Sequence, residues 1–414
     1  MTASLVTRIL EFNCDREPER LALKYAAMRR DPFSFFRGTA HLFHDDWPKR
    51  SPLDRTALTW ACGDLHLENF GSYEGGNRLA YFDINDFDEA ALAPCARDLA
   101  RFLTSVLLAA AAIRVRASDA RELCRETLRA YGSALRLGKP GWVERDTARG
   151  MVRSLLKRVR SRTRAELLAE RTVFRQGRRR IRTDGRHAIP ATRDMRHAVT
   201  TALQAFGARQ SDPRYYKVVD VARRIAGTGS LGLERFVVLV RGSGVADGHV
   251  LLDVKQAAPS ALIPSLRTPQ PTWRNEADRV VTIQQRVQAV SPALLHVLRV
   301  GGDWCILREL QPMEDRLSLA GAHRKLPRLR RALETMAQVI AWGQLRCAGR
   351  GGSAIGDEWV AFGHDRQWPR GVLDYAVRYV RTVRHDWKEF AVAYDDHVFD
   401  ADPSAREPRA SARS

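Results

Sequence analysis

Apolar positions recur at helical spacing over most of residues 1–60 and again from Ala96 to about Gly138, where alanine and leucine predominate. Two short apolar runs, 57–61 and 78–82, lie between these segments, and each ends in an acidic, polar loop. Short apolar runs bounded by turn residues are typical of strands. The first third of the chain is therefore predicted to be mainly helical, with two short strands inside it.

The pattern changes to strands in the middle of the chain. β-Branched and aromatic residues form three short runs within 216–256, and a fourth run covers 304–308. A helix is predicted over about 275–289, and two or three further helices extend to about Tyr394. The last segment, 401–414, is small and polar and contains proline, so we expect it to be disordered.

The composition is that of a folded, strongly basic protein. The 414 residues include 68 Lys+Arg and 48 Asp+Glu, a net charge of +20, and eight of the basic residues are lysines. Such a charge suits a nucleic acid, a phosphate-bearing small molecule or an acidic partner. The arginines concentrate in 145–186, where Phe174 is the only aromatic residue, so stacking on single-stranded nucleic acid is not favoured. We interpret this block mainly as a solvated face or docking surface.

The ends and the cysteines indicate the compartment. Residues 1–20 contain no apolar run of the secretory type, and the most apolar segment, 99–113, contains Arg101 and is too short to span a membrane. The six cysteines form no CxxC pair, which argues against a zinc site or a disulfide framework. We therefore expect a cytoplasmic protein without a membrane span.

A glycine-rich loop marks a candidate nucleotide site. The segment Gly227-Thr-Gly-Ser-Leu-Gly232 has the GxGxxG spacing that dinucleotide-binding folds and kinases share. The residues after Gly232 favour a strand rather than a helix, which is the kinase arrangement, with a hairpin covering the phosphates. The predicted phosphate-contacting residues of this loop are Gly227, Gly229, Ser230 and Gly232.

The next predicted strand carries Lys255, in a context that resembles the Val-Ala-Ile-Lys strand of kinases. The compact ammonium group of a lysine suits the α- and β-phosphates of a nucleotide, and this chain otherwise prefers arginine. Glu276, which opens the following helix, is a candidate ion-pair partner for Lys255. The alternatives are an edge lysine extending into solvent and a first-turn carboxylate that interacts only with the helix dipole.

Two acidic loops, 62–70 and 82–89, follow the two short strands and supply the most specific chemistry. Their carboxylates, with Asn69 five residues after Asp64, suit a magnesium-phosphate site, because Mg²⁺ takes a few protein oxygens and completes its shell with water or phosphate. One aspartate must remain available as the base for an attacking hydroxyl. An exposed acidic turn pair is the alternative, but it would not need His66 at a fixed offset.

These loops resemble known families. Gly63-Asp-Leu-His-Leu-Glu-Asn69 is similar to the HGDxHxxN catalytic loop of aminoglycoside and choline kinases, and Asp86-Phe-Asp-Glu-Ala resembles their metal-binding segment. A longer set of segments resembles a bacterial family called domain of unknown function 2252, which implies a kinase-like fold without an established substrate. These segments are 31–38, the Gly63 loop, 82–88 and 307–312.

The resemblance implies that Asp64 is the catalytic aspartate, with His66 in the same loop, and that Asn69 is a magnesium ligand. The second metal ligand is Asp86 or Asp83, and the Asp-Phe-Asp-Glu-Ala string favours Asp86. Cys62 departs from the pattern of the small-molecule kinases, which usually have histidine at this position. Arg37, in a nearby aromatic segment, could clamp an anionic group of the substrate or pair with one of the aspartates.

The order of the motifs is reversed relative to ordinary kinases, because Asp64 precedes Gly227. We therefore expect a two-lobed α+β kinase-like fold that is circularly permuted, with 306–312, including Glu309, as the strand and hinge beside adenine. The helix 329–346 would be the one that leads into the catalytic loop. The expected segments are 1–140 (catalytic loops), 141–212 (arginine-rich insertion), 213–312 (antiparallel nucleotide lobe), 313–400 (helical part) and 401–414 (tail).

The sequence thus predicts a phosphotransferase that uses ATP and Mg²⁺ and acts on an unidentified hydroxyl of a small molecule or a protein. Transfer of AMP to a protein by the same site is an alternative. A third hypothesis is a basic nucleic-acid-binding protein whose kinase-like pocket is vestigial.

Overall fold

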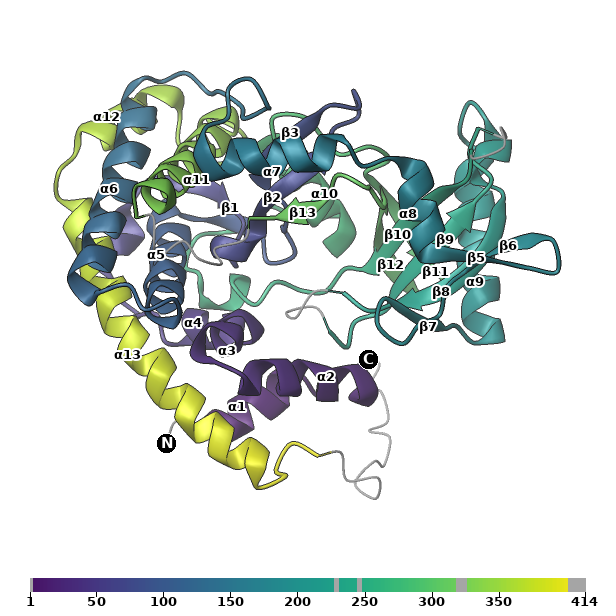
Figure 1. The fold of residues 1–414 in the computed structure, drawn as a ribbon. Coiled ribbons are helices and arrows are strands. Elements are labelled where there is room, and N and C mark those ends of the chain that lie inside the picture. Colours follow the sequence, from purple (N-terminus) through teal and green to yellow (C-terminus); the bar gives the residue numbers. More distant parts are fainter. Residues whose placement is uncertain (1–2, 227–230, 244–247, 318–325, 401–414) are drawn as a thin grey trace.

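The computed structural model describes residues 3–226, 231–243, 248–317 and 326–400, which form a mixed α and β structure (Figure 1). The positions predicted for Gly227, Gly229 and Ser230, and for the tail at 401–414, lie outside these residues. Among the described helices, none combines the length and the apolar character needed to cross a membrane.

Thirteen α-helices occur in the described part of the chain. They are α1 (Leu5–Phe12), α2 (Pro18–Arg29), α3 (Pro32–Gly38), α4 (Ala40–Asp45), α5 (Cys95–Ala112), α6 (Ala117–Arg136), α7 (Gly150–Arg160), α8 (Arg164–Arg171), α9 (Arg193–Gly207), α10 (Glu276–Val287), α11 (Leu326–Arg346), α12 (Gly356–His364) and α13 (Trp368–Asp395).

The strands pair in antiparallel fashion. They are β1 (Leu58–Ala61), β2 (Phe70–Glu74), β3 (Ala80–Ile84), β4 (Ala91–Pro94), β5 (Thr172–Arg175), β6 (Arg178–Ile181), β7 (Ala188–Pro190), β8 (Val218–Arg224), β9 (Arg235–Val240), β10 (Val250–Gln256), β11 (His296–Val300), β12 (Asp303–Glu309) and β13 (Asp315–Arg316). The largest sheet has the order β11-β12-β10-β9-β8-β7, and β2 lies between β3 and β13 in a smaller one.

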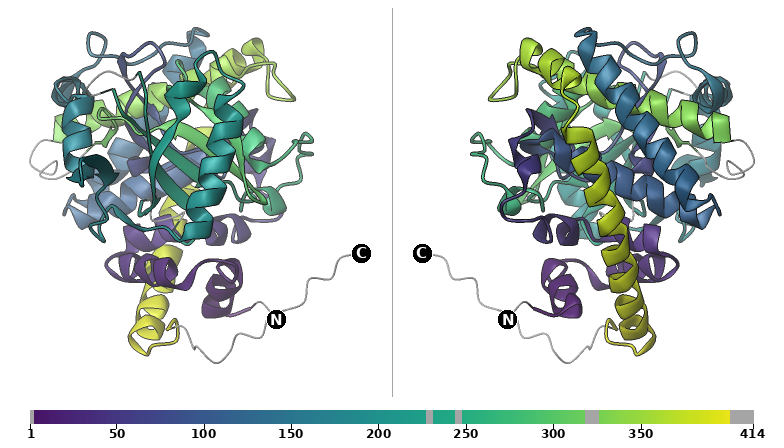
Figure 2. Two further views of the ribbon diagram at one scale, coloured as in Figure 1. Left: turned by 90° about the vertical axis from the view of Figure 1, so that its right-hand side faces the viewer. Right: turned by 90° about the vertical axis from the view of Figure 1, so that its left-hand side faces the viewer.

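The largest hydrophobic core lies among the helices at the end of the molecule opposite the six-stranded sheet (Figure 1). Helix α5 is buried along nearly its whole length, α6 and α13 pack against it, and α11 packs against α6. The long helix α13 also contacts α1, α2 and α3, so both ends of the described chain meet on one side (Figure 2). The single helix expected from Ala96 to Gly138 is in fact two helices, because Arg114 adopts a left-handed φ of 59° between them.

The arginine block 145–186 contains more than a solvated helix. Helix α7 is amphipathic and buries Val152, Leu155 and Val159 against the main core. Helix α8 and the β5–β6 hairpin follow, and Leu168 and Ile181 pack against one face of the six-stranded sheet. The block is therefore two helices and a hairpin rather than one solvated helix, because regularly spaced aliphatic residues between the arginines pack against the core and the sheet.

The alternation of side chains along β10 gives the large sheet two different faces. Val250, Leu252 and Val254 pack on one face into a core that α9 covers. Asp253 and Lys255 point to the opposite face, toward the acidic loops. Alternate residues of β10 therefore face the hydrophobic core and a polar cleft.

Candidate functional site

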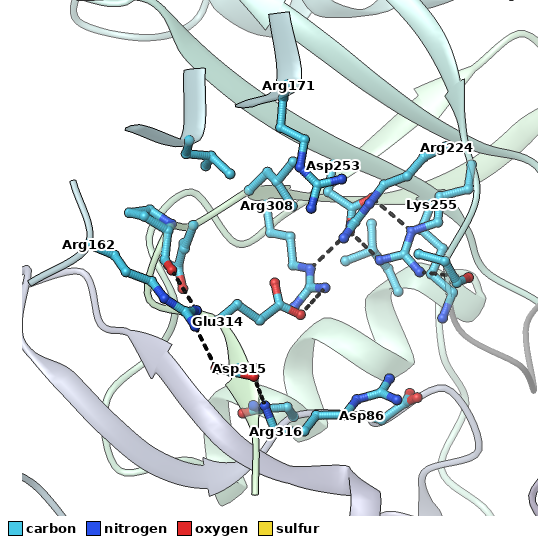
Figure 3. A pocket seen from close by; sticks show the side chains of 18 of the residues that line it. Asp86, Arg162, Arg171, Arg224, Asp253, Lys255, Arg308, Glu314, Asp315 and Arg316 are labelled. Carbon is cyan, nitrogen blue, oxygen red and sulfur yellow. Dashed lines mark hydrogen bonds and ion pairs between the residues drawn. The ribbon is translucent and has the colours of Figure 1, made fainter. Parts of the chain in front are cut away.

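A cleft of about 920 Å³ separates the six-stranded sheet from the acidic loops (Figure 3). Asn69, just before β2, and Asp86, just after β3, line it from the side of the loops. Lys255 lines it from β10. The structure thus brings together Asn69, Asp86 and Lys255, three candidate site residues from distant segments of the sequence.

Residues 62–69 after β1, called the catalytic-type loop below, are held in place by helix α5. The carboxylate of Asp98 on α5 accepts hydrogen bonds from the backbone N–H groups of Cys62, at 2.8 Å, and Gly63, at 3.0 Å. Gly63 has a φ of +81°, and a Cβ there would lie 2.2 Å from the carbonyl oxygen of Glu89. A glycine is therefore required for the loop to approach the second acidic loop this closely.

Asp64 occupies the centre of this loop. Its Oδ1 accepts a hydrogen bond from Arg101 Nε at 2.6 Å, and its carbonyl oxygen accepts one from Asn69 Nδ2 at 2.7 Å. Burial raises the pKa of Asp64 to about 7, and the negative charges of Asp86 and Glu89 add to this increase while Arg101 opposes it. A carboxylate with a pKa near neutrality suits a general base.

His66 and Arg37 lie beside Asp64 but have other partners. His66 Nδ1 accepts a hydrogen bond from Glu68 N at 3.2 Å, and His66 Nε2 lies 3.9 Å from Asp64 Oδ2. Burial holds the pKa of His66 well below its usual value, so the ring is neutral. Arg37 pairs with Glu68 at 2.7 Å and lies over the ring of Phe33. One of the two alternatives for Arg37 was an ion pair with an aspartate of the acidic loops. This pair is not observed among the described residues.

The two candidates for the second metal ligand face different surroundings. Asp83 is buried and accepts hydrogen bonds from Ile84 N at 2.8 Å and from Ala289 N and Arg346 Nη2 at 3.4 Å. It is not among the described residues that line the cleft, whereas Asp86 is. Burial raises the pKa of Asp86, and the negative charge of Asp88 adds to the effect. Of the two aspartates, Asp86 is the one placed to bind a ligand.

Lys255 contacts the second acidic loop directly. Its ammonium group forms an ion pair with Asp88, and its positive charge also acts on the pKa of Asp86. The expected pair between Lys255 and Glu276 is not seen among the described contacts. Glu276 instead accepts a hydrogen bond from Arg279 Nε at 2.6 Å, three residues further along α10. The local partner on the same helix takes the place of the distant lysine.

Glu309 and Gly232, the other predicted nucleotide contacts, do not belong to the described lining of the cleft. The Glu309 carboxylate pairs with Arg78 at 2.7 Å and with Arg164 at 3.1 Å. Gly232 has a φ of +96°, and its carbonyl oxygen accepts a hydrogen bond from Glu17 N at 3.2 Å. Glu309 thus acts in structural ion pairs, and Gly232 joins the loop to the segment between α1 and α2.

A second cavity, of about 490 Å³, adjoins the first at the acidic loops. Asp64, Glu89 and Arg37 line it, and Asp86 and Asp88 line both cavities. The candidate metal ligand Asp86 therefore faces both spaces, and the candidate base Asp64 faces the second one. Such an arrangement can receive two reactants that meet at the acidic loops.

Several charged residues of the site were not selected from the sequence. Arg101 lies in the most apolar segment of the chain. A charged residue in such a segment indicates a buried charge that needs a partner, so the sequence did contain a signal for Arg101. Asp253 lies on the cleft side of β10 and pairs with arginines from three other strands of the same sheet, β8, β9 and β12. These contacts depend on strand register, which the order of residues in one strand does not reveal.

The side chains present can contribute to a magnesium site but cannot complete one alone. In the described part of the chain, no three His, Cys, Asp or Glu side chains come together as a metal-binding group. Asp86 and Asn69 line the same cleft and offer one carboxylate and one amide oxygen. This fits Mg²⁺, which commonly binds one or two protein carboxylates and takes further oxygens from phosphate and water.

Comparison with known proteins places the chain in a family. Searches among curated proteins and among solved structures returned no match. Residues 16–393, however, match the family described as uncharacterized protein conserved in bacteria (DUF2252). This match covers nearly all of the described helices and strands and includes both acidic loops, Lys255 and the glycine-rich loop. The chain belongs to the DUF2252 family.

Proposed function

We propose that this protein is a kinase-like phosphotransferase that uses ATP with Mg²⁺. One observation carries the proposal: Lys255 and Asp88 are in contact although 167 residues separate them, and both line one cleft with Asp86 and Asn69. A phosphate-binding lysine opposite a pair of metal-binding side chains is the arrangement that phosphoryl transfer requires. The acceptor is a hydroxyl group of a small molecule or a protein.

The reaction would take place where the two cavities meet. An acceptor hydroxyl in the second cavity gives its proton to Asp64 while its oxygen forms a bond to the terminal phosphorus of ATP. The bond from that phosphorus to the bridging oxygen breaks, and ADP leaves. Asn69 and Asp86 would hold Mg²⁺, which neutralises the phosphate charge, and Lys255 would exchange Asp88 for a phosphate oxygen.

Arg101 and Asp98 would keep the base in position. Arg101 binds the Asp64 carboxylate from the buried helix α5, and Asp98 fixes the backbone at Cys62 and Gly63. The loop therefore needs little reorganisation before the proton is transferred, which is the condition for an effective base.

The order of the motifs leads us to infer a circularly permuted, two-lobed kinase-like fold. The six-stranded sheet would be the nucleotide lobe, and the helices around α5 and α11 would form the catalytic lobe. The segment between β12 and β13 would then be the hinge. It crosses from the sheet to the side of β2, where Gln311 exchanges two hydrogen bonds with the backbone of Glu74.

The direct test combines nucleotide binding with turnover. ATP with Mg²⁺ should raise the melting temperature of the wild-type protein and of Asp64→Asn, whereas ATP consumption should be lost in Asp64→Asn. Asp146→Asn, at an exposed position on the arginine block, is the matched control and should behave as wild type. Full turnover in Asp64→Asn would overturn the assignment of the base.

Labelled ATP identifies the group that is transferred. Incubation with a cell extract should move label from the γ-phosphate, but not from the α-phosphate, to an acceptor. Label moving from the α-phosphate would replace phosphotransfer by nucleotidyl transfer. If no nucleotide changes the melting temperature with or without Mg²⁺, the proposed function is wrong.

A further inference from the structure

The cleft-facing wall of the large sheet carries a cluster of arginines around one buried carboxylate (Figure 3). Asp253 Oδ2 lies 2.6 Å from Arg224 Nη1 on β8, 2.5 Å from Arg235 Nη2 on β9 and 3.1 Å from Arg308 Nε on β12. All four residues line the cleft. In the following paragraphs, Arg224, Arg235 and Arg308 are called the arginine wall.

The arginine wall has more positive charge than its described partners neutralise. Its three guanidinium groups face Asp253 and, through Arg308 Nη2 at 3.2 Å, Glu314. Counting these direct ion pairs alone, one positive charge is in excess, on side chains that are at most about a fifth exposed, and Asp86 is the next carboxylate whose charge acts on Arg308. An excess charge in such a poorly solvated place is costly unless an anion balances it.

The arginine wall continues the row of positive charge that begins at Lys255. Arg235 on β9 is the cross-strand neighbour of Lys255, and Arg308 on β12 is the cross-strand neighbour of Asp253. Arg235 contributes to the pKa of Asp86, and Asp86 to that of Arg308, so the wall and the candidate metal ligand act on the same space. A bound anion could therefore extend from Asp86 past Lys255 along the sheet.

Helix α8 and the turn before it add to this lining. Arg162 and Arg171 face the same cleft, paired with Asp315 at 2.7 Å and with Glu170 at 3.4 Å. Both come from the arginine block, so part of this block reaches the cleft although it is distant in sequence from the acidic loops. Guanidinium groups suit phosphate oxygens, because their fixed N–H donors match the geometry of a phosphate.

We propose that the cleft takes a linear polyphosphate chain longer than a triphosphate, with its terminal phosphate at Asp86 and its remaining phosphates along Lys255 and the arginine wall. This rests on the proposed function and adds a second class of phosphoryl donor, beside ATP, for the same site. The acceptor oxygen bonds to the terminal phosphorus, the adjoining P–O bond breaks, and a chain one phosphate shorter leaves. The hydroxyl proton goes to Asp64.

The test compares three anions in the presence of Mg²⁺: tripolyphosphate, ATP and medium-chain linear polyphosphate. Titration calorimetry of the full chain should give about tenfold tighter binding for the long chain than for the other two, as expected for an added charge-assisted contact. The double variant Arg224→Gln/Arg308→Gln should lose this advantage and keep its affinity for tripolyphosphate. Arg381→Gln, at an exposed position of α13, is the control and should leave all three affinities unchanged.

A second variant covers the case in which the double variant fails to fold. Arg162→Gln/Arg171→Gln removes arginines at the partly exposed edge of the cleft and should reduce the preference for the long chain severalfold. Equal affinity for ATP and the long chain, with ATP binding still dependent on Asp86, overturns this inference and leaves the proposed function standing. Absence of binding by all three anions overturns both.

Discussion

Arg101 and Asp64 form the closest buried contact of the candidate base: Arg101 Nε donates to Asp64 Oδ1 at 2.6 Å, and the Arg101 side chain is fully buried in α5. Arg101 Nη2 also donates to the carbonyl oxygen of Phe36 at 3.0 Å. The guanidinium plane lies over the Phe36 ring, 4.0 Å from its centroid. One arginine therefore joins the α3 segment, the buried helix and the catalytic-type loop.

Removing this arginine should destabilise the protein. In Arg101→Met, Asp64 would be buried without its cation, and the free energy of unfolding at pH 8 should fall by about 3 kcal/mol. Burial already raises the pKa of Asp64, so its carboxyl group can take up a proton in the folded state. The loss should therefore be smaller at pH 5. Denaturant titrations at both pH values measure this, with Arg125→Met on the exposed face of α6 as control. Equal losses at both pH values would contradict the explanation.

The activity should depend on the ionisation of Asp64. Because its pKa is raised to about 7, the base becomes protonated as the pH falls below 7, and kcat/KM should then drop about tenfold per pH unit. Glu89→Gln removes a neighbouring negative charge while keeping an oxygen for Ala261 N, so the midpoint of this drop should move to lower pH. The pH profile of kcat/KM in both proteins is the measurement. A midpoint that moves upward in Glu89→Gln would exclude this origin of the pKa.

Asp83 on β3 and Asp86 just after it should differ in their effects. Asp86→Asn should abolish the Mg²⁺-dependent increase in melting temperature with ATP and leave the stability nearly unchanged, because the hydrogen bond that its Oδ1 accepts from Asp88 N, at 3.3 Å, can also be accepted by an amide oxygen. Asp83→Asn should lower the free energy of unfolding by about 2 kcal/mol, because it weakens the contacts to Ile84 N and Arg346, and keep the Mg²⁺ effect. The reverse pattern would assign the metal to Asp83.

The first turn of helix α2 should restrain residues 231–234. Arg20 on α2 donates to the Leu233 carbonyl oxygen at 2.6 Å and to Glu234 at 2.9 Å, 213 and 214 residues away in sequence. Arg20→Met should increase hydrogen exchange in 231–234 about tenfold, because the donor that holds this backbone is lost. Arg29→Met, in an exposed pair on the same helix, should have no such effect. Unchanged exchange in Arg20→Met would show that this backbone is held by two other hydrogen bonds, from Arg16 Nη1 to the Leu231 carbonyl oxygen at 2.9 Å and from Glu17 N to the Gly232 carbonyl oxygen at 3.2 Å.

The sequence was informative where chemistry and local pattern coincide. Motif spacing in the sequence identified Asp64, Asn69 and Asp86 as site residues, and these residues lie close together in the structure. The predicted strands around Lys255 correspond to β8, β9 and β10. Such patterns of residue types indicate which polar or charged side chains a loop carries and which face of a strand is apolar. They were sufficient to expect a mixed fold with antiparallel strands.

The pairings between distant segments were harder to predict. Nothing in the residues near Lys255 indicates Asp88 rather than Glu276 as its partner, because that choice depends on where α10 packs. The break before α6 was missed because no proline or glycine marks it, and Arg114 takes the left-handed conformation instead. Cross-strand neighbours such as Asp253 and Arg308 follow from register, which the hydrophobic pattern fixes only once the sheet is assembled.

The pairing of β13 with β2 has a consequence for synthesis of the protein. Arg316 on β13 contacts Glu68 in the catalytic-type loop, 248 residues earlier in the chain. At about 5–20 residues per second, a ribosome needs roughly 12–50 s to make the intervening chain. During this time β2 is paired with β3 alone, and the strands that form the opposite wall of the cleft are still being made. A nascent chain should therefore be unable to bind phosphate compounds until β13 has emerged, and premature termination before it should leave an inactive and aggregation-prone product.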